Sequence, residues 1–140
     1  MRLALDRRSE YVMRAVLDVA SQSDPVWRKK QEIGEATGVP LSYLAHILAA
    51  LVQARILVAR SGPSGGYGLR RPGERITLLE IIEALEGPIN AENCVLRGGT
   101  CNWAEPCALH DAWTRAQEAI ASELQRTTVA EVLSEMAIAG

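Results

Sequence analysis

All three cysteines of the 140-residue chain, Cys94, Cys101 and Cys107, lie in one short glycine-containing segment. His110 follows on the third position after the last cysteine. Thiolates and imidazoles are the side chains that bind zinc and iron. The spacing Cys-x6-Cys-x5-Cys-x2-His lacks the short paired knuckles that are typical of structural zinc sites. A wide loop with three thiolates suits a larger inorganic group, and we interpret the segment as a site for an iron–sulfur cluster.

The residues around the cysteines favour this interpretation. Gly98 and Gly99 let the backbone approach inorganic sulfide and offer amide donors to it. Pro106 predicts a helix start that places Cys107 in the first turn, where the positive helix end stabilises a thiolate. His110 lies one turn further on the same face, so it is a candidate ligand of the same site. Structural zinc, or three free thiols packed as small apolar groups, are the alternatives.

The composition predicts a helical protein with an aliphatic core. Hydrophobic residues make up 48% of the chain, aromatic residues only 4%, and phenylalanine is absent. The N-terminus is charged where a secretory signal would be apolar, and no apolar run approaches the roughly 20 residues of a membrane span. We therefore expect a cytoplasmic protein, in which clustered cysteines indicate metal or redox chemistry rather than structural disulfides.

Charge is divided unevenly along the chain. Residues 1–72 carry a formal charge of +5 and residues 73–140 a charge of −7, within a total of −2. The alternative to a functional asymmetry is chance unevenness on a solvated surface. We interpret the basic first half as the part that meets an anion.

The first half has the periodicity of a helix-turn-helix. Ser9 is a candidate cap for a helix that runs to about Ser21. A short helix over 30–37 ends at Gly38, and a longer helix opens at Pro40 and runs to about Arg55. Four leucines are expected on the buried face of this longer helix: Leu41, Leu44, Leu48 and Leu51.

The elements that follow predict a wing and a long C-terminal helix. Residues 56–60 and 67–71 indicate two strands joined by the turn sequence SGPSGG. Thr77 and Glu80 predict a capping box at the start of the next helix, which ends at Gly87. A helix from Pro106 to about Arg126 would be roughly 30 Å long, more than so small a domain covers, so we expect it to pair with a second copy. Thr128 and Glu131 predict a last short helix.

A winged helix-turn-helix predicts DNA binding, with the second helix in the major groove and basic groups on phosphate or in the minor groove. A dimer would read a palindromic operator with half-sites about one helical turn apart. Tyr43 has the alternative role of packing against a neighbouring helix. The candidate DNA contacts are Arg28, Lys29, Lys30, Ser42, Tyr43, His46, Arg60, Arg70 and Arg71.

Over nearly its full length the chain resembles the Rrf-two family of bacterial winged-helix regulators, which includes the IscR, NsrR and RirA types. The resemblance is carried by the wing and the cysteine segment together with four other pieces. The matching pieces are MRL, EYVMRAVLDVA, GVPLSYLAHIL, GPSGGYGL, ITLLEIIEALEG and CALHDAW.

The resemblance implies a homodimeric transcription factor that holds a 2Fe-2S or 4Fe-4S cluster near its dimer interface. Cys94, Cys101 and Cys107 would be ligands. The fourth ligand would be His110, as in the IscR type, or Glu10 from the other subunit, as in some redox or nitric-oxide sensors.

The chain departs from the family in three places. Extra residues precede Tyr11, and the interval between the first two cysteines is one residue longer. Ala45 and His46 replace the Glu and Gln of the IscR type. Because these two positions lie in the recognition helix, their replacement predicts a different operator.

These observations divide the chain into a DNA-binding domain (1–87), a cluster-binding loop (88–107) and a dimerisation and C-terminal helix region (108–140). Two alternative functions are a cluster-free winged-helix regulator that senses thiol oxidation or a small molecule, and an iron–sulfur electron carrier. No G-x-G-x-x-G nucleotide fingerprint follows a strand and no second cluster motif is present, which argues against a redox enzyme or carrier. We therefore expect a regulator and not an enzyme.

Overall fold

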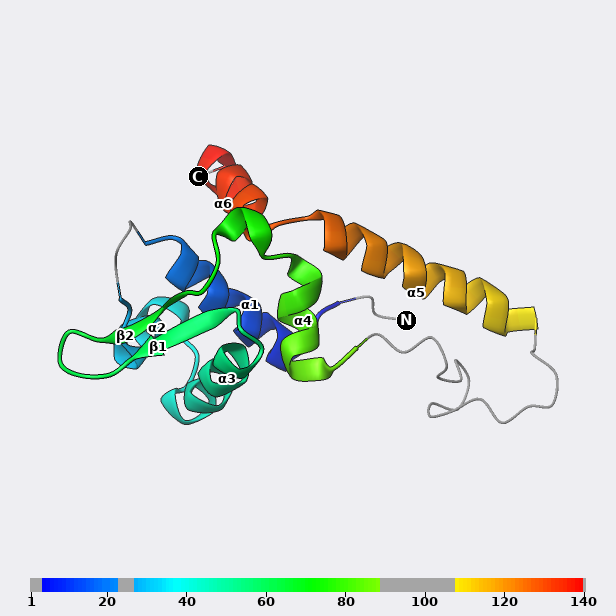
Figure 1. Cartoon of the computed structure of the whole chain (residues 1–140). Helices are drawn as coiled ribbons and strands as arrows, with labels where there is room; N and C mark the ends of the chain where they lie inside the picture. The colour runs from blue at the N-terminus through cyan, green and yellow to red at the C-terminus, as the bar shows by residue number, and fades with distance from the viewer. Residues whose placement is uncertain (1–3, 23–26, 89–107, 140) are drawn as a thin grey trace.

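The described part of the chain, residues 4–22, 27–88 and 108–139 of a computed structural model, consists of six α-helices, a two-stranded antiparallel sheet and a short 3-10 turn (Figure 1). The predicted mainly helical class, with a helix-turn-helix followed by a wing, is confirmed. In chain order the elements are α1 (Arg7–Ala20), α2 (Lys30–Thr37), α3 (Leu41–Gln53), β1 (Leu57–Arg60), β2 (Gly66–Leu69), η1 (Gly73–Arg75), α4 (Leu78–Glu86), α5 (Ala108–Arg126) and α6 (Val129–Ala139).

Helix α1 begins earlier than the sequence predicted, and its cap is Asp6 instead of Ser9. The Asp6 carboxylate accepts a hydrogen bond of 2.8 Å from the Ser9 amide. Ser9 itself is buried within the first turn of the helix, where its hydroxyl lies 3.4 Å from a carboxylate oxygen of Glu86 in α4. The predicted cap is therefore wrong, because an aspartate three residues upstream satisfies the free amide equally well.

Helices α2 and α3 form the predicted helix-turn-helix. Gly38 ends α2 with a φ of 78°, a left-handed conformation that favours glycine. Pro40 stands at the N-cap of α3. Among the described residues no single helix is long and apolar enough to cross a membrane, and α2 with α3 reach that length and composition only as a pair bent by 114°.

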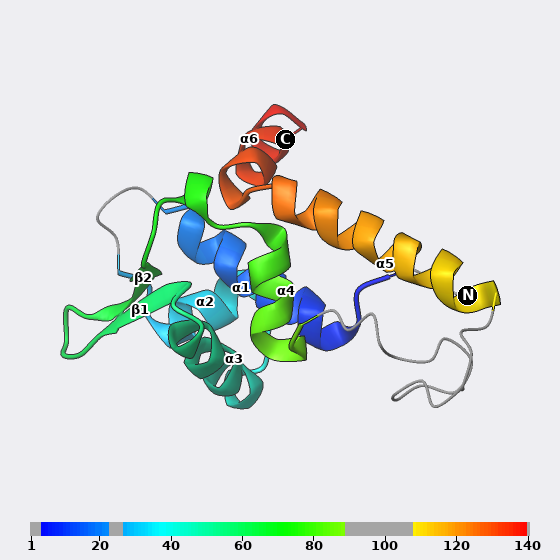
Figure 2. The same ribbon diagram turned by 45° about the vertical axis from the view of Figure 1, so that its right-hand side comes forward.

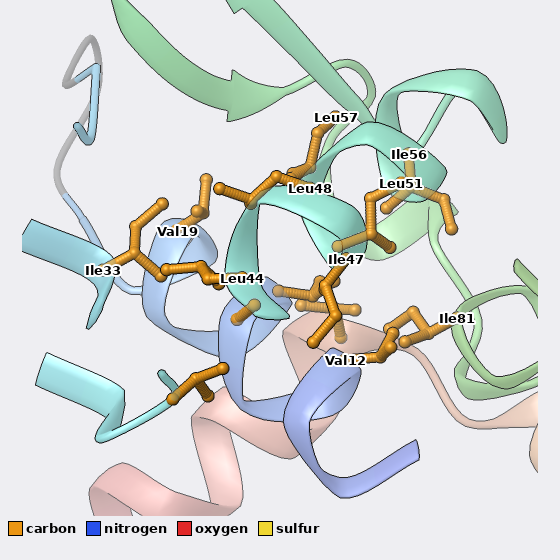
Figure 3. Packing of buried hydrophobic residues seen from close by; sticks show 14 of the residues in the cluster. Val12, Val19, Ile33, Leu44, Ile47, Leu48, Leu51, Ile56, Leu57 and Ile81 are labelled. Carbon is orange, nitrogen blue, oxygen red and sulfur yellow. The ribbon is translucent and has the colours of Figure 1, made fainter. Parts of the chain in front are cut away.

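The core lies where α3 crosses α1 beside α4 and β1 (Figure 3). The α3 residues Leu44, Leu48 and Leu51 are fully buried, as predicted. Leu41 is 45% exposed, so its predicted burial is wrong; it stands at the first position of α3, where its side chain lies against Gly34 of α2. The buried hydrophobic residues are Val12, Ala15, Val16, Val19, Ile33, Val39, Leu44, Ile47, Leu48, Leu51, Ile56, Leu57, Ile76, Ile81 and Val129.

Strands β1 and β2 form the predicted wing, with Leu57 opposite Leu69 and Arg60 opposite Gly66. The chain before α2 adds a third extended piece beside β2. The Arg28 amide donates to the Tyr67 carbonyl at 3.0 Å, and the Tyr67 amide donates to the Arg28 carbonyl at 2.7 Å. Strand β2 is therefore paired on both sides, with β1 and with the segment before α2.

Helices α4 and α6 each begin with a local cap, and a backbone hydrogen bond joins the two starts. The Glu80 amide donates to the Thr77 hydroxyl at 3.2 Å, and the Thr77 amide donates to the Glu80 carboxylate at 2.9 Å, as predicted. Thr128 accepts from the Glu131 amide at 3.2 Å at the start of α6. The Val129 amide donates to the Ile76 carbonyl at 2.9 Å. The start of α6 is thus joined to the start of α4, while α5 extends away from the winged body (Figures 1 and 2).

Candidate nucleic-acid interface and cluster ligands

Helix α3 presents Ser42 and His46 to solvent on the face opposite the core. Tyr43 is half-buried, with its ring edge-on to Tyr11 of α1 at a centroid distance of 5.6 Å. The rings of Tyr43 and His46 are 6.4 Å apart. Tyr43 therefore packs against α1, the alternative that the sequence had left open, while the exposed hydroxyl of Ser42 and imidazole of His46 offer hydrogen-bonding groups of the kind that read base edges.

The wing places Arg60 at the end of β1, where its side chain is exposed. Its guanidinium carbon lies 5.6 Å from the centroid of the Trp27 ring, within the range of a cation–π contact. Arg70 is also exposed, just after β2. Arg71 is held in the fold: it donates to the Arg75 carbonyl at 2.8 Å and to a Glu80 carboxylate oxygen at 3.1 Å.

The three basic residues before and at the start of α2 differ in their surroundings. Arg28 forms an ion pair with Asp18 of α1 at 3.1 Å and a second with Glu32 at 3.4 Å, and its side chain is 16% exposed. The hydrogen bonds to Asp18 raise the pKa of Arg28, so it stays charged at any ordinary pH. Lys29 and Lys30 are exposed. Arg28 therefore fastens α1 to the start of α2, while the contact of the two exposed lysines with phosphate stays a prediction.

Helix α3 and the hairpin lie next to each other at the end of the molecule away from the start of α5 (Figures 1 and 2). Exposed groups of α3, the wing and the start of α2 thus belong to the same end of the fold. A surface that combines hydrogen-bonding side chains on a helix with flanking cations can hold a duplex by its phosphates and reach its base edges. The candidate contacts themselves remain predictions.

The three predicted cysteine ligands, Cys94, Cys101 and Cys107, lie outside the described residues, as do Gly98, Gly99 and Pro106. His110 lies in the first turn of α5 and is half-buried. Glu10, in the first turn of α1, forms an ion pair with Arg14, which also donates to the Thr37 carbonyl at 3.5 Å. Within residues 4–22, 27–88 and 108–139 no group of three or more His, Cys, Asp or Glu side chains could hold a metal ion. The ligand set therefore stays a prediction.

Two residues that the sequence analysis did not single out shape this interface. Asp18 holds Arg28, and Trp27 underlies Arg60. Trp27 directly precedes the basic run of residues 28–30, and an aromatic ring beside clustered cations is a signal for cation–π contact. Asp18 gave no such signal, since its partner is set by the packing of α1 against the start of α2.

The comparisons with known proteins agree with this architecture. Residues 5–135 match the Rrf2 family model, described as an iron-dependent transcriptional regulator. The chain belongs to the Rrf2 family. It is 31% identical over 138 residues to the HTH-type transcriptional regulator IscR of Yersinia enterocolitica, covering 97% of this chain and 82% of that one.

Solved structures give the same fold. CymR, the global cysteine regulator of B. subtilis, matches with a TM-score of 0.80 at 23% identity, covering 96% of this chain and 98% of that one. IscR of T. potens matches with a TM-score of 0.78 at 22% identity, covering 96% and 88%. The predicted family and fold are confirmed, and the chain is a transcriptional regulator. Regulators of this type act by binding DNA, as the exposed face of α3 and the wing suggest.

Proposed function

We propose that this Rrf2 regulator is a homodimer that binds a palindromic operator and whose affinity for DNA is set by an iron–sulfur cluster. The observation that carries the proposal is the donor set. Every thiol of the chain falls between residues 94 and 107, directly before the long helix α5. The description of the family as iron-dependent and the 31% identity to an IscR support it.

The residues suit the cluster chemically. Cys94, Cys101 and Cys107 supply three soft thiolate ligands, the type that iron–sulfur clusters require. His110 in the first turn of α5, or Glu10 of the other subunit, completes the set; of the two we favour His110. Releasing Glu10 for ligation would cost its ion pair with Arg14. When bound, the cluster supplies a centre that reacts with oxygen, nitric oxide or cellular reductants.

Dimerisation is supported by the apolar stripe of α5. Leu109 and Ile120 are 53% and 47% exposed, and Trp113 and Leu124, on the same stripe, are half-buried. A helix that projects from the body with such a face needs an apolar partner. We propose that α5 of a second copy covers it, which places two winged heads on one duplex with half-sites about 34 Å apart.

Helix α5 provides a physical connection between the cysteines and the winged heads. Its 19 residues span about 28 Å, from directly after Cys107 to the junction with α6. At that junction the Leu78 amide donates to the Thr127 carbonyl at 3.0 Å. A change in the ordering of the cysteine segment would tilt α5 and so alter the separation of the heads. A coupling of about 1–3 kcal/mol is enough to change operator affinity usefully, and we expect the cluster-bound form to bind best.

The cluster is tested by isolating the wild-type protein without oxygen and measuring bound iron, acid-labile sulfide and visible absorption. We expect iron and sulfide in similar amounts with a thiolate-to-iron absorption band. Cys101→Ala should lose the band, while Thr100→Ala in the same segment should keep it. Wild-type protein that repeatedly lacks iron and sulfide would overturn the proposal.

The fourth ligand is tested by comparing His110→Ala with Glu10→Gln. If His110 is the ligand, its variant shifts the absorption and electron paramagnetic resonance signals of the cluster, and the Glu10 variant leaves them unchanged. The reverse result would assign Glu10, supplied by the other subunit, as the fourth ligand.

The likeness to CymR, a cysteine regulator, favours a second candidate, a regulator that senses the oxidation state of its thiols without a cluster. The cluster-free regulator can be distinguished from the cluster-containing one by experiment. The protein would be isolated colourless, its cysteines would react with thiol reagents, and mild oxidation alone would change operator affinity.

A further inference from the structure

The contact between Trp27 and Arg60 joins two segments that are far apart in the sequence. Trp27 precedes α2, whereas Arg60 ends β1 next to the turn of the wing. The guanidinium carbon lies 5.6 Å from the ring centroid, and the Arg60 side chain is otherwise exposed to solvent. Arginine is the cation that most often stacks on aromatic rings, because its planar guanidinium is weakly hydrated.

Glycines in the opposing strand make room for this contact. Gly66 and Gly68 of β2 stand opposite Arg60 and Val58 of β1, on one face of the hairpin. A Cβ added at Gly68 would lie 3.4 Å from Cζ3 of Trp27, so the ring rests directly on the backbone of β2. A larger residue there would lift the ring away from the sheet.

The segment that carries Trp27 is itself firmly held. Its neighbour Arg28 makes both backbone hydrogen bonds to Tyr67, at 3.0 and 2.7 Å, and its side chain forms the ion pair with Asp18. The backbone next to Trp27 is therefore anchored to β2 and, through the Arg28 side chain, to α1, and the ring itself rests on β2. Arg60 is the flexible member of the pair.

We propose that Trp27 is a positioning residue for DNA binding, which holds the Arg60 guanidinium in the orientation in which it meets the duplex. This inference rests on the proposed function, in which Arg60 contacts phosphate or the minor groove. A stacked guanidinium keeps its N–H edge free for acceptors, whereas an unstacked arginine must lose its rotamer freedom when the complex forms. Pre-organisation of this kind strengthens binding without adding a contact.

The test is a double-mutant cycle in DNA binding. The probe is a short duplex enriched from a random pool by the wild-type protein, and the readout is fluorescence anisotropy at several salt concentrations. Trp27→Leu keeps apolar bulk but removes the ring, and should weaken binding about two- to fivefold, the effect of losing one exposed cation–π contact. Trp27→Phe should lose less, and Arg60→Lys, which keeps the charge but not the planar group, should resemble Trp27→Leu.

The decisive comparison is Trp27→Leu in an Arg60→Ala background, where the proposal predicts no further loss of affinity. Arg115→Ala, on exposed α5, is the control for removing one positive charge, and thermal unfolding confirms that each variant is folded. An equal loss in both backgrounds would mean that Trp27 acts only on the fold, and would overturn the positioning role. If Arg60→Ala has no effect at all, the proposed wing contact itself fails, while DNA binding through α3 is tested separately by Ser42→Ala.

Discussion

At the scale of single residues, the basic side chains of the winged head divide into two groups. Arg28 and Arg71 are bound to carboxylates of the fold, Asp18 and Glu80 respectively. The exposed lysines at the start of α2 and the exposed arginines of the wing are open to solvent. The first group should contribute mainly to folding and the second mainly to DNA affinity.

Arg28→Ala should lower the free energy of unfolding by about 2 kcal/mol, because it leaves the mostly buried Asp18 carboxylate without its cation. Lys29→Ala is the matched comparison. It should leave stability within about 0.5 kcal/mol and reduce the slope of log affinity against log salt by about 0.9 if the lysine meets phosphate. Denaturant unfolding and salt-dependent anisotropy measure the two effects. A stable Arg28→Ala protein with a reduced salt slope would reverse the assignment.

The Asp6 cap predicts a dependence of stability on pH. The hydrogen bond from the Ser9 amide lowers the pKa of Asp6 below its ordinary value. Because the folded state favours the ionised carboxylate, this stabilisation is present at neutral pH. It is lost as the pH falls below the ordinary aspartate pKa of about 3.9 and through the folded value.

Asp6→Ala should therefore destabilise the protein by about 1 kcal/mol at neutral pH. Asp6→Asn keeps an oxygen acceptor, so it should retain most of this stability and flatten the decline in acid. Thermal unfolding at neutral pH and between pH 3 and 5 measures both effects. An Asp6→Asn variant with the same acid profile as wild type would assign the pH dependence to other groups.

At the scale of elements, the wing depends on a glycine that no other residue replaces easily. A Cβ at Gly65 would lie 2.1 Å from the Arg60 carbonyl oxygen, a backbone atom that cannot swing aside. Gly65→Ala should therefore shift the hairpin and weaken DNA binding at least about tenfold, as expected for losing 1–3 kcal/mol of contacts. The core of the helices should unfold at nearly the wild-type temperature. Ser64→Ala, at the exposed tip, is the control and should bind normally.

The elements differ in how far the sequence predicted them. Helix α2, the Thr77–Glu80 capping box and the wing follow from local signals: a glycine stop, a Thr-x-x-Glu pair and a glycine-rich turn. The cap of α1 and the exposure of Leu41 could not be predicted from local signals. Both depend on where each helix begins once it is packed in the fold. The Trp27–Arg60 contact depends on tertiary structure, since it joins segments that no sequence period connects.

At the scale of the whole molecule, the exposed apolar stripe of α5 predicts an assembly of two chains. Ile120→Glu would place a charge in the centre of that stripe and should convert the dimer to a monomer, which analytical ultracentrifugation detects. Glu118→Gln, on the adjoining exposed face, is the matched control and should remain dimeric. A wild-type protein that sediments as a monomer at micromolar concentration would remove the basis for the two-headed arrangement.

The molecule separates its two proposed functions. The wing and the start of α5, the helix that directly follows Cys107, lie at opposite ends of the fold (Figure 2). Helix α5 runs from the end of the cysteine segment to its junction with α6, and backbone hydrogen bonds join this junction to the start of α4 in the winged head. We therefore propose that regulation works through the relative placement of two heads in the dimer.

The most direct test of this account is operator affinity measured on one anaerobic preparation before and after its iron is removed with a chelator. We predict that iron removal weakens binding by about 5- to 150-fold, the range of a coupling of 1–3 kcal/mol. We also predict that Cys101→Ala binds as weakly with or without the treatment. An affinity that is the same before and after iron removal, in a protein that contained iron and sulfide, would contradict the claim that the cysteines control DNA binding.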